Sequence, residues 1–205
     1  GVSMERRNNY AVQAQSAKQI FLSYDQNALA EKLHLPMDSD YLYTSFLGAP
    51  YRIARRTGDL ERKDGGVWVD GNSFDEVLSI FDLVCDSRED RKITGVWKNM
   101  TDFGLQFHQN LMESRDVLAE FAQRAPAEYR AALEKMGGRR VIVRTFDLGA
   151  DKQVEDLELA LFFWAGDEEF SPQIRYLWDE NALAYIRYET MYYVLDWLRT
   201  RLDLK

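Results

Sequence analysis

The chain has 205 residues, of which 46% are hydrophobic and 13% aromatic, and this composition supports a substantial buried core. Its 34 acidic and 26 basic side chains give a formal net charge of -8, and without a compensating Lys/Arg stripe we expect no nucleic-acid partner. No apolar run reaches the roughly 18 residues of a membrane helix, and residues 1–10 lack the apolar core of a signal peptide. We therefore expect no membrane partner and a cytoplasmic location.

Two helices are predicted at the start of the chain. We assign residues 1–8 to a tag remnant or a flexible N-terminus, and residues 9–205 to a single domain. Apolar residues follow helical spacing from Asn9 onward. Asp25 can cap a second, shorter helix that Pro36 ends.

Extended runs separated by glycine-containing turns occupy residues 41–69, and this pattern predicts an antiparallel meander. The section is locally basic, but acidic residues lie among the basic ones. We interpret it as a solvated sheet face, with an anion-binding site as the alternative. The basic residues are Arg52, Arg55, Arg56, Arg62 and Lys63.

A helix is predicted to begin at Ser73. Glu76 stands three residues later, a spacing at which each side chain can accept the other residue's backbone N–H. Apolar residues from Phe74 to Cys85 then recur at helical intervals, so Cys85 lies on the buried stripe and its thiol should be unreactive. Because Cys85 is the only cysteine, we expect no haem, zinc–cysteine or iron–sulfur site within the chain.

Residues 93–112 show no regular period and interleave aromatic side chains with polar ones. Such segments can line a pocket or simply cover a sheet. Trp97 and His108 are therefore candidate ligand-binding residues, although we favour a structural role for both. His34, the other histidine, lies near a predicted helix end, and two scattered histidines form no zinc motif.

The second half of the chain mixes helices and strands. Ser114 opens one predicted helix and Pro126 begins the next, which together predict a helical hairpin. Residues 140–147 alternate and return through a polar loop to a strand that starts at Leu157, so we expect the two strands to pair antiparallel. A terminal helix over residues 187–202 carries an apolar stripe that should pack on the core.

The most apolar strand ends in an acidic corner. Gly166 breaks the apolar run, and Asp167, Glu168 and Glu169 follow it. In an extended segment Asp167 and Glu169 point to one side, so they are candidate ligands for a hard cation. Crowded carboxylates can also supply a general acid beside a general base. The alternative, which we favour, is that Asp167 caps the turn while the glutamates meet arginines or solvent.

Three stretches of the chain resemble one known family. They are YLYTSFLGAPYRI from Tyr41, TGVWKNM from Thr94, and FFWAGDEEFSPQIRYLWDENALAYI from Phe162. Together they resemble the bacterial and archaeal family DUF3786 over roughly residues 25–202. Because that family has no characterised activity, the resemblance implies a coherent fold and no substrate. Some relatives carry an additional cysteine-rich iron–sulfur module, and this chain, with only Cys85, departs from that pattern.

We predict an α+β fold in which an antiparallel or mixed sheet is flanked by helices. The predicted function is small-ligand binding or a protein-accessory role, with an unknown protein or small molecule as partner. The alternative is a metal-dependent hydrolase or transferase that uses Asp167, Glu168 and Glu169 beside Trp97. An enzyme would enclose these carboxylates in a concave pocket, whereas an accessory protein would expose an apolar patch.

Overall fold

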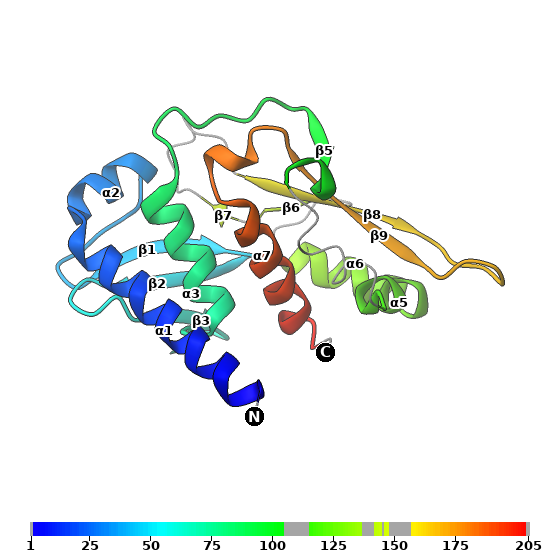
Figure 1. Cartoon of the computed structure of the whole chain (residues 1–205), viewed down its shortest axis with the longest axis horizontal. Helices are drawn as coiled ribbons and strands as arrows, with labels where there is room; N and C mark the ends of the chain where they lie inside the picture. The colour runs from blue at the N-terminus through cyan, green and yellow to red at the C-terminus, as the bar shows by residue number, and fades with distance from the viewer. Residues whose placement is uncertain (1, 105–114, 137–141, 145, 148–156, 204–205) are drawn as a thin grey trace.

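The computed structural model describes residues 2–104, 115–136, 142–144, 146–147 and 157–203, and it confirms the predicted α+β fold (Figure 1). The described helices are α1 (Val2–Ser23), α2 (Gln26–Leu33), α3 (Phe74–Phe81), α5 (Val117–Arg124), α6 (Pro126–Lys135) and α7 (Tyr188–Arg201). The strands are β1 (Tyr41–Phe46), β2 (Ala49–Ala54), β3 (Leu60–Asp64), β4 (Val67–Asp70), β5 (Trp97–Asn99), β6 (Ile142–Arg144), β7 (Phe146–Asp147), β8 (Glu158–Trp164) and β9 (Gln173–Asp179). A π-helical turn, η1 (Asp82–Asp86), continues α3. Across these residues, no helix is both long and apolar enough to cross a membrane.

The first sheet has the strand order β4-β3-β2-β1-β7, and all of its pairings are antiparallel. The predicted meander over residues 41–69 is therefore confirmed, with β1 to β4 as consecutive neighbours. Alternate side chains of β1 and β2 face the core, and Leu42, Tyr51 and Ile53 are completely buried. β7 comes from much later in the chain and joins this sheet beside β1.

Three helices lie together, with α3 between α1 and α7 (Figure 1). The ring of Tyr10 on α1 stacks on Phe74 of α3 at 4.3 Å, and Tyr193 of α7 meets Phe74 edge-on at 5.1 Å. Lys18 donates a hydrogen bond of 2.8 Å to Asp59 Oδ1, which ties α1 to the first sheet as well. α1 begins at Val2, so the structure is helical in a segment where we predicted a tag remnant or flexible N-terminus.

The second sheet has the order β5-β9-β8-β6, again with antiparallel pairings. The predicted pairing of the strand at residues 140–147 with the Leu157 strand is confirmed for β6, because Val143 lies opposite Leu159. Phe146 and Asp147 instead form β7 and pair with β1, so the strand that we predicted as one is divided between the two sheets. β8 is an interior strand of this sheet, with Leu159 and Leu161 completely buried.

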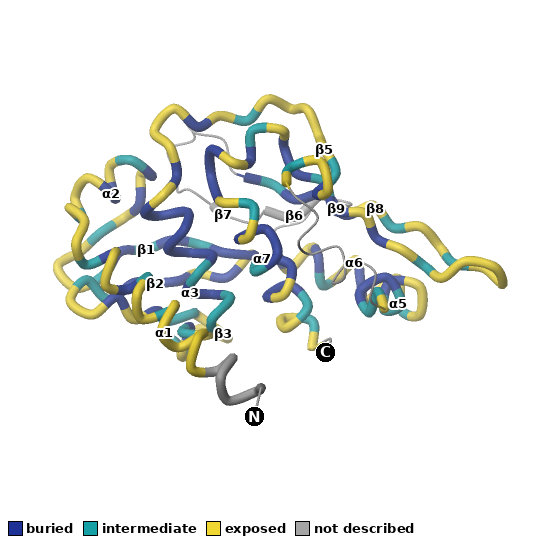
Figure 2. Tube along the Cα trace, viewed as in Figure 1, coloured by how far each residue is buried: buried dark blue, intermediate teal, exposed yellow. Residues whose placement is uncertain are grey.

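β8 and β9 extend beyond their neighbouring strands as a projecting hairpin (Figure 1). We call residues 162–175 of this hairpin the hairpin arm. Figure 2 shows that most of the arm is exposed, in contrast to the buried strands at its base. At its turn an alanine Cβ in place of Gly166 would lie 2.6 Å from the nitrogen of Pro172, which explains why the apolar run ends with a glycine.

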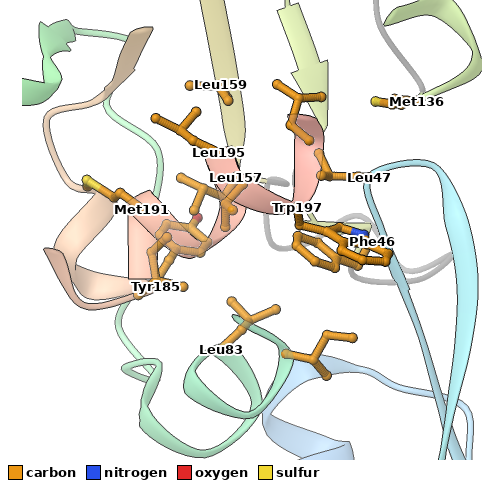
Figure 3. Packing of buried hydrophobic residues seen from close by; sticks show 14 of the residues in the cluster. Phe46, Leu47, Leu83, Met136, Leu157, Leu159, Tyr185, Met191, Leu195 and Trp197 are labelled. Carbon is orange, nitrogen blue, oxygen red and sulfur yellow. The ribbon is translucent and has the colours of Figure 1, made fainter. Parts of the chain in front are cut away.

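Buried residues of both sheets and of α7 belong to one hydrophobic cluster. Figure 3 shows Trp197 of α7 beside Phe46 of the first sheet, and Leu195 close to Leu159 of the second. Burying a side chain of this size contributes about 1.5–3 kcal/mol, so the apolar face of α7 holds the two sheets together. The assignment of residues 9–205 to a single domain stays a prediction.

A buried ion pair lies where we predicted a reciprocal helix cap. Ser73 Oγ accepts a hydrogen bond from Glu76 N, as expected. The Glu76 carboxylate does not reach back to the Ser73 amide; it accepts a hydrogen bond of 2.8 Å from Ser73 Oγ and bonds of 2.6 Å from Tyr51 Oη and from Arg62 Nη1. Glu76 is only 2% exposed, so its charge requires a partner. Arg62 therefore faces the core, and its assignment to a solvated sheet face was wrong.

The starts of α2 and α6 are those that we predicted, whereas α5 is capped by a residue that we did not predict. Asp25 caps α2, and Pro126 is the first residue of α6, as predicted. The cap of α5 is Asp116, whose Oδ1 accepts a hydrogen bond of 2.9 Å from Ala119 N. The predicted opening residue, Ser114, lies outside the described residues.

Candidate functional site

A cleft lies where α1, the end of α3 with its π-helical turn, and the start of α7 meet. Its volume is about 310 Å³, and one wall is the turn η1, so we call it the π-turn cleft. The lining combines apolar side chains with charged and polar groups. These residues include Val12, Ser16, Ala17, Ile20, Leu78, Phe81, Asp82, Cys85, Asp86, Arg187, Glu189, Thr190 and Tyr193.

Asp82 is the most tightly bound charged group of the cleft, with 2% of its surface exposed. Its Oδ2 accepts hydrogen bonds from Arg187 N at 2.7 Å and from Thr190 Oγ1, and its Oδ1 accepts one from Arg187 Nε at 2.9 Å. The first N–H groups of a helix have no partner within that helix, and the helix dipole makes this end attractive to anions. Asp82 therefore caps α7 from a neighbouring helix.

Asp86 lies on the same side of η1 as Asp82, but its side chain is more exposed and makes fewer hydrogen bonds. Its Oδ2 accepts a hydrogen bond of 3.0 Å from Arg187 Nη2, and its side chain is 43% exposed. Burial raises the pKa of the Asp86 carboxyl, Arg187 opposes this shift, and contact with Asp82 raises the pKa further. Asp86 is therefore the carboxyl of this pair whose partner and charge can change when a ligand enters.

The π-helical turn widens the chain where Asp82, Cys85 and Asp86 reach the cleft. Such turns are rare and occur often at functional sites. Lys32 of α2 holds the end of the turn, because its Nζ donates hydrogen bonds to the carbonyls of Cys85 at 3.4 Å and Ser87 at 3.0 Å. Burial raises the pKa of the Cys85 thiol to about 12, so the thiol is buried and protonated, which agrees with the prediction that it is inert.

The predicted ligand-binding residues lie away from this cleft. Trp97 is on β5, is 37% exposed, and lines a separate hollow together with Phe162 and Trp164. His108 lies outside the described residues. The structure thus brings Trp97 toward the hairpin arm and leaves it apart from the carboxyls of η1.

The acidic corner forms the turn at the tip of the hairpin arm. Asp167 Oδ1 accepts hydrogen bonds of 2.8 Å from the backbone N–H groups of both Glu169 and Phe170, and these bonds lower the pKa of Asp167. All three acidic residues of the corner are exposed. Among the described residues, no group of three or more His, Cys, Asp or Glu side chains is placed to hold a metal ion. Cation binding by Asp167 and Glu169 stays a prediction.

A family model described as "Domain of unknown function (DUF3786)" matches residues 25–201. The chain belongs to the DUF3786 family. No curated protein and no solved structure matches the chain. The DUF3786 match includes the α3, η1 and α7 sides of the π-turn cleft and leaves out α1, so one wall of the cleft lies outside the matched residues.

Two of the stretches that resemble DUF3786 meet in the second sheet. β5 pairs with β9, and Trp97 lies opposite Asp179. The Asp179 carboxylate, in a residue that is 3% exposed, accepts hydrogen bonds from the backbone N–H groups of Thr94, Gly95 and Asn181. Gly95 has a φ of 81°, a conformation that favours glycine. Asp179 therefore fixes the turn that leads into β5, which joins the two DUF3786 stretches into one unit.

Sequence reasoning missed the charged residues of the cleft. Asp82 and Asp86 interrupt an otherwise apolar helical run, and that interruption is a signal that could have identified them. Nothing in the sequence indicated that Arg187 and Thr190, at the start of the last helix of this DUF3786 chain, would meet Asp82. That contact depends on how α3 and α7 pack.

Proposed function

We propose that the chain is a small-ligand-binding module whose π-turn cleft takes an organic cation with an apolar body, such as a small primary amine. The observation that carries the proposal is the composition of the cleft, in which apolar side chains of α1 and α3 surround the partly exposed Asp86 carboxyl. A few polar groups in a mostly apolar concavity are typical of small-molecule sites. The proposal assigns binding and no reaction.

The charges that line the cleft support a cationic ligand. Among the described residues that line the cleft, Asp82, Asp86 and Glu189 contribute three carboxyls, and Arg187 is the one basic residue. An ammonium group beside Asp86 would favour its ionised form and offset the repulsion between the two aspartates. Arg187 could make room for such a group, because its side chain is 69% exposed and can turn toward solvent.

The size and walls of the cleft support a compact apolar body. Its volume of about 310 Å³ lies at the small end of the range for ligand pockets, roughly 300–1,000 Å³. Val12 and Ile20 of α1 are 64% and 51% exposed, so a ligand that covers them removes apolar surface from water. A single ring or a short alkyl chain that carries one amine meets both requirements.

Thermal unfolding of the full chain with three matched compounds tests the proposal. We expect benzylamine to raise Tm in a dose-dependent manner, whereas benzyl alcohol and benzoate, of nearly the same size, leave Tm unchanged. A ligand at about 100 times its Kd stabilises the folded state by about 2.7 kcal/mol, which is large enough to measure. Equal Tm shifts from all three compounds would contradict a cation site. So would the absence of a Tm shift with both benzylamine and short alkylamines.

Two variants separate the cleft from other surfaces. Asp86→Asn keeps the shape of the side chain and removes its charge, and Ser16→Trp fills the cleft from α1 without changing a carboxyl. Both should abolish the amine-dependent shift. Glu134→Gln, at an exposed position of α6, is the matched control and should keep it. A shift that persists in both cleft variants would place the amine elsewhere.

A further inference from the structure

The outer face of the second sheet carries exposed aromatic side chains. Phe162 and Trp164 of β8 are 43% and 59% exposed, and Trp97 of β5 is 37% exposed. Together with Leu177 of β9 they line a hollow of about 360 Å³, and we call these four residues the aromatic face. The other side of β8 and β9 packs on α5, so the strands are covered on that side (Figure 1). Contiguous exposed apolar surface of this kind marks an interaction site.

Cationic side chains border the aromatic face. Lys98 and Arg175 line the same hollow, and neither forms an ion pair within the part of the chain that the structure describes. Asp102 is the one acidic residue in the described part of the lining, so this region is locally positive in a chain with a net charge of -8. Charge complementarity therefore calls for an occupant that is both acidic and apolar.

The tip of the hairpin arm has this complementary character. Phe170 is 67% exposed, more than any other large apolar residue among those described. Glu168 and Glu169 stand next to it, are exposed, and form no ion pair with described residues. Asp167 holds the turn in shape through the amides of Glu169 and Phe170. The chain thus presents an acidic and aromatic tip in a defined turn.

We propose that two copies of this chain pair through their hairpin arms, each placing its acidic tip against the Lys98 and Arg175 side of the other's aromatic face. Within one molecule the tip continues β8 and β9 outward, away from the base of the sheet, so it can meet such a face only on another molecule (Figure 1). The occupant is a second copy because this chain itself supplies the required acidic and apolar surface.

A two-fold axis relates the two chains, so the assembly stops at a dimer. With the two arms antiparallel, each tip meets the base of the opposite arm and both contacts are identical, as in an isologous dimer. The two aromatic faces then pack against each other in the manner of stacked sheets, which lie about 10 Å apart. This arrangement buries Phe162 and Trp164, which are exposed in the single chain.

Sedimentation velocity of the full chain, with charge-reversal variants, tests the pairing. The wild-type mass should rise with protein concentration toward twice the 24.0 kDa of one chain. We expect Lys98→Glu/Arg175→Glu and Glu168→Lys/Glu169→Lys each to weaken self-association by at least about tenfold, because like charges then face each other. An equal mixture of the two variants should recover association, since both contacts of the mixed dimer pair opposite charges.

Matched controls lie on the first sheet and in the turn between β2 and β3. Arg56→Glu reverses an exposed charge, and Val67→Ser removes an apolar side chain that is 63% exposed, yet neither should change association. Trp164→Ser should weaken it without altering the circular dichroism spectrum. A wild type that stays monomeric at every concentration overturns the proposal, and so does a mixture of natively folded variants that fails to associate.

Discussion

Two acidic regions of this molecule differ in what the fold does to them. Along the seam between α3 and α7, Asp75 and Asp86 are partly withdrawn from water, and burial raises the pKa of both carboxyls. In the turn at residues 167–169 the carboxylates are exposed, and backbone hydrogen bonds lower the pKa of Asp167. The denser acidic cluster in the sequence is residues 167–169. There the fold lowers a pKa, that of Asp167, as is usual for a carboxylate that accepts backbone hydrogen bonds in a turn.

The contrast shows that the number of adjacent carboxylates is a poor guide to their reactivity. A pKa rises when the charged form loses water or meets a like charge, and both conditions depend on neighbours in space. Asp75 meets the charge of Asp196 across the seam, and Asp86 meets Asp82 one turn away. Four measurements test this contrast.

The largest effect should follow from Asp82→Ala. Removing this carboxylate leaves the amide of Arg187 and the hydroxyl of Thr190 without their acceptor, and it removes the cap of α7. Breaking such a buried, charge-assisted network should cost about 3 kcal/mol in the free energy of unfolding, measured in urea. Asp82→Asn keeps the shape and one oxygen acceptor, so it should lose less. Wild-type stability in Asp82→Ala would show that α7 does not depend on this contact.

The next effect is a pH dependence that belongs to Asp75. Burial raises the pKa of its carboxyl from 3.8 to about 7, with smaller contributions from Asp196 and Glu76. Between these values the folded chain holds a proton that the unfolded chain releases, so this residue lowers stability as the pH rises. Compared with wild type, Asp75→Asn should gain at least about 1.4 kcal/mol between pH 4 and pH 8, the free energy of a one-unit shift.

Urea unfolding at a series of pH values measures this gain. Asp64→Asn, at the exposed end of β3, is the matched control and should track the wild type at every pH. A difference between Asp75→Asn and wild type that stays constant with pH would mean that Asp75 titrates as it does in the unfolded chain.

A smaller and local effect is expected from Asp167→Ala. The amides of Glu169 and Phe170 lose their acceptor, so their hydrogen exchange should become faster. Global stability should fall much less than in Asp82→Ala, because both amides can bond to water instead. Unchanged exchange at these two amides would contradict the role of Asp167 in the turn.

The smallest effect should be the response to metal ions. We expect magnesium, manganese and calcium each to leave the Tm of the wild type unchanged, because Asp167 already accepts two backbone hydrogen bonds. Asp167→Asn/Glu169→Gln should behave in the same way. A metal-dependent increase in Tm that this double variant abolishes would instead support the cation site for which Asp167 and Glu169 were candidates.

The parts of the fold that sequence reasoning predicted are those with a local cause. The meander follows from alternation and turns, and the starts of α2 and α6 follow from Asp25 and Pro126. Its errors and omissions concern long-range contacts. The Glu76 carboxylate was expected to accept the backbone N–H of Ser73, but it accepts hydrogen bonds from the Ser73 hydroxyl and from Tyr51 and Arg62 of the sheet.

The pattern of residues along the chain indicates where most helices and strands lie and which of their faces are apolar, because these properties repeat with the period of each element. Which polar groups meet depends on how the elements pack. Asp82 and Arg187 are 105 positions apart, and their hydrogen bonds exist because α3 and α7 pack side by side. Desolvation and pairing energies depend on distance in space, so the π-turn cleft and its carboxyls become visible only once the helices are in place.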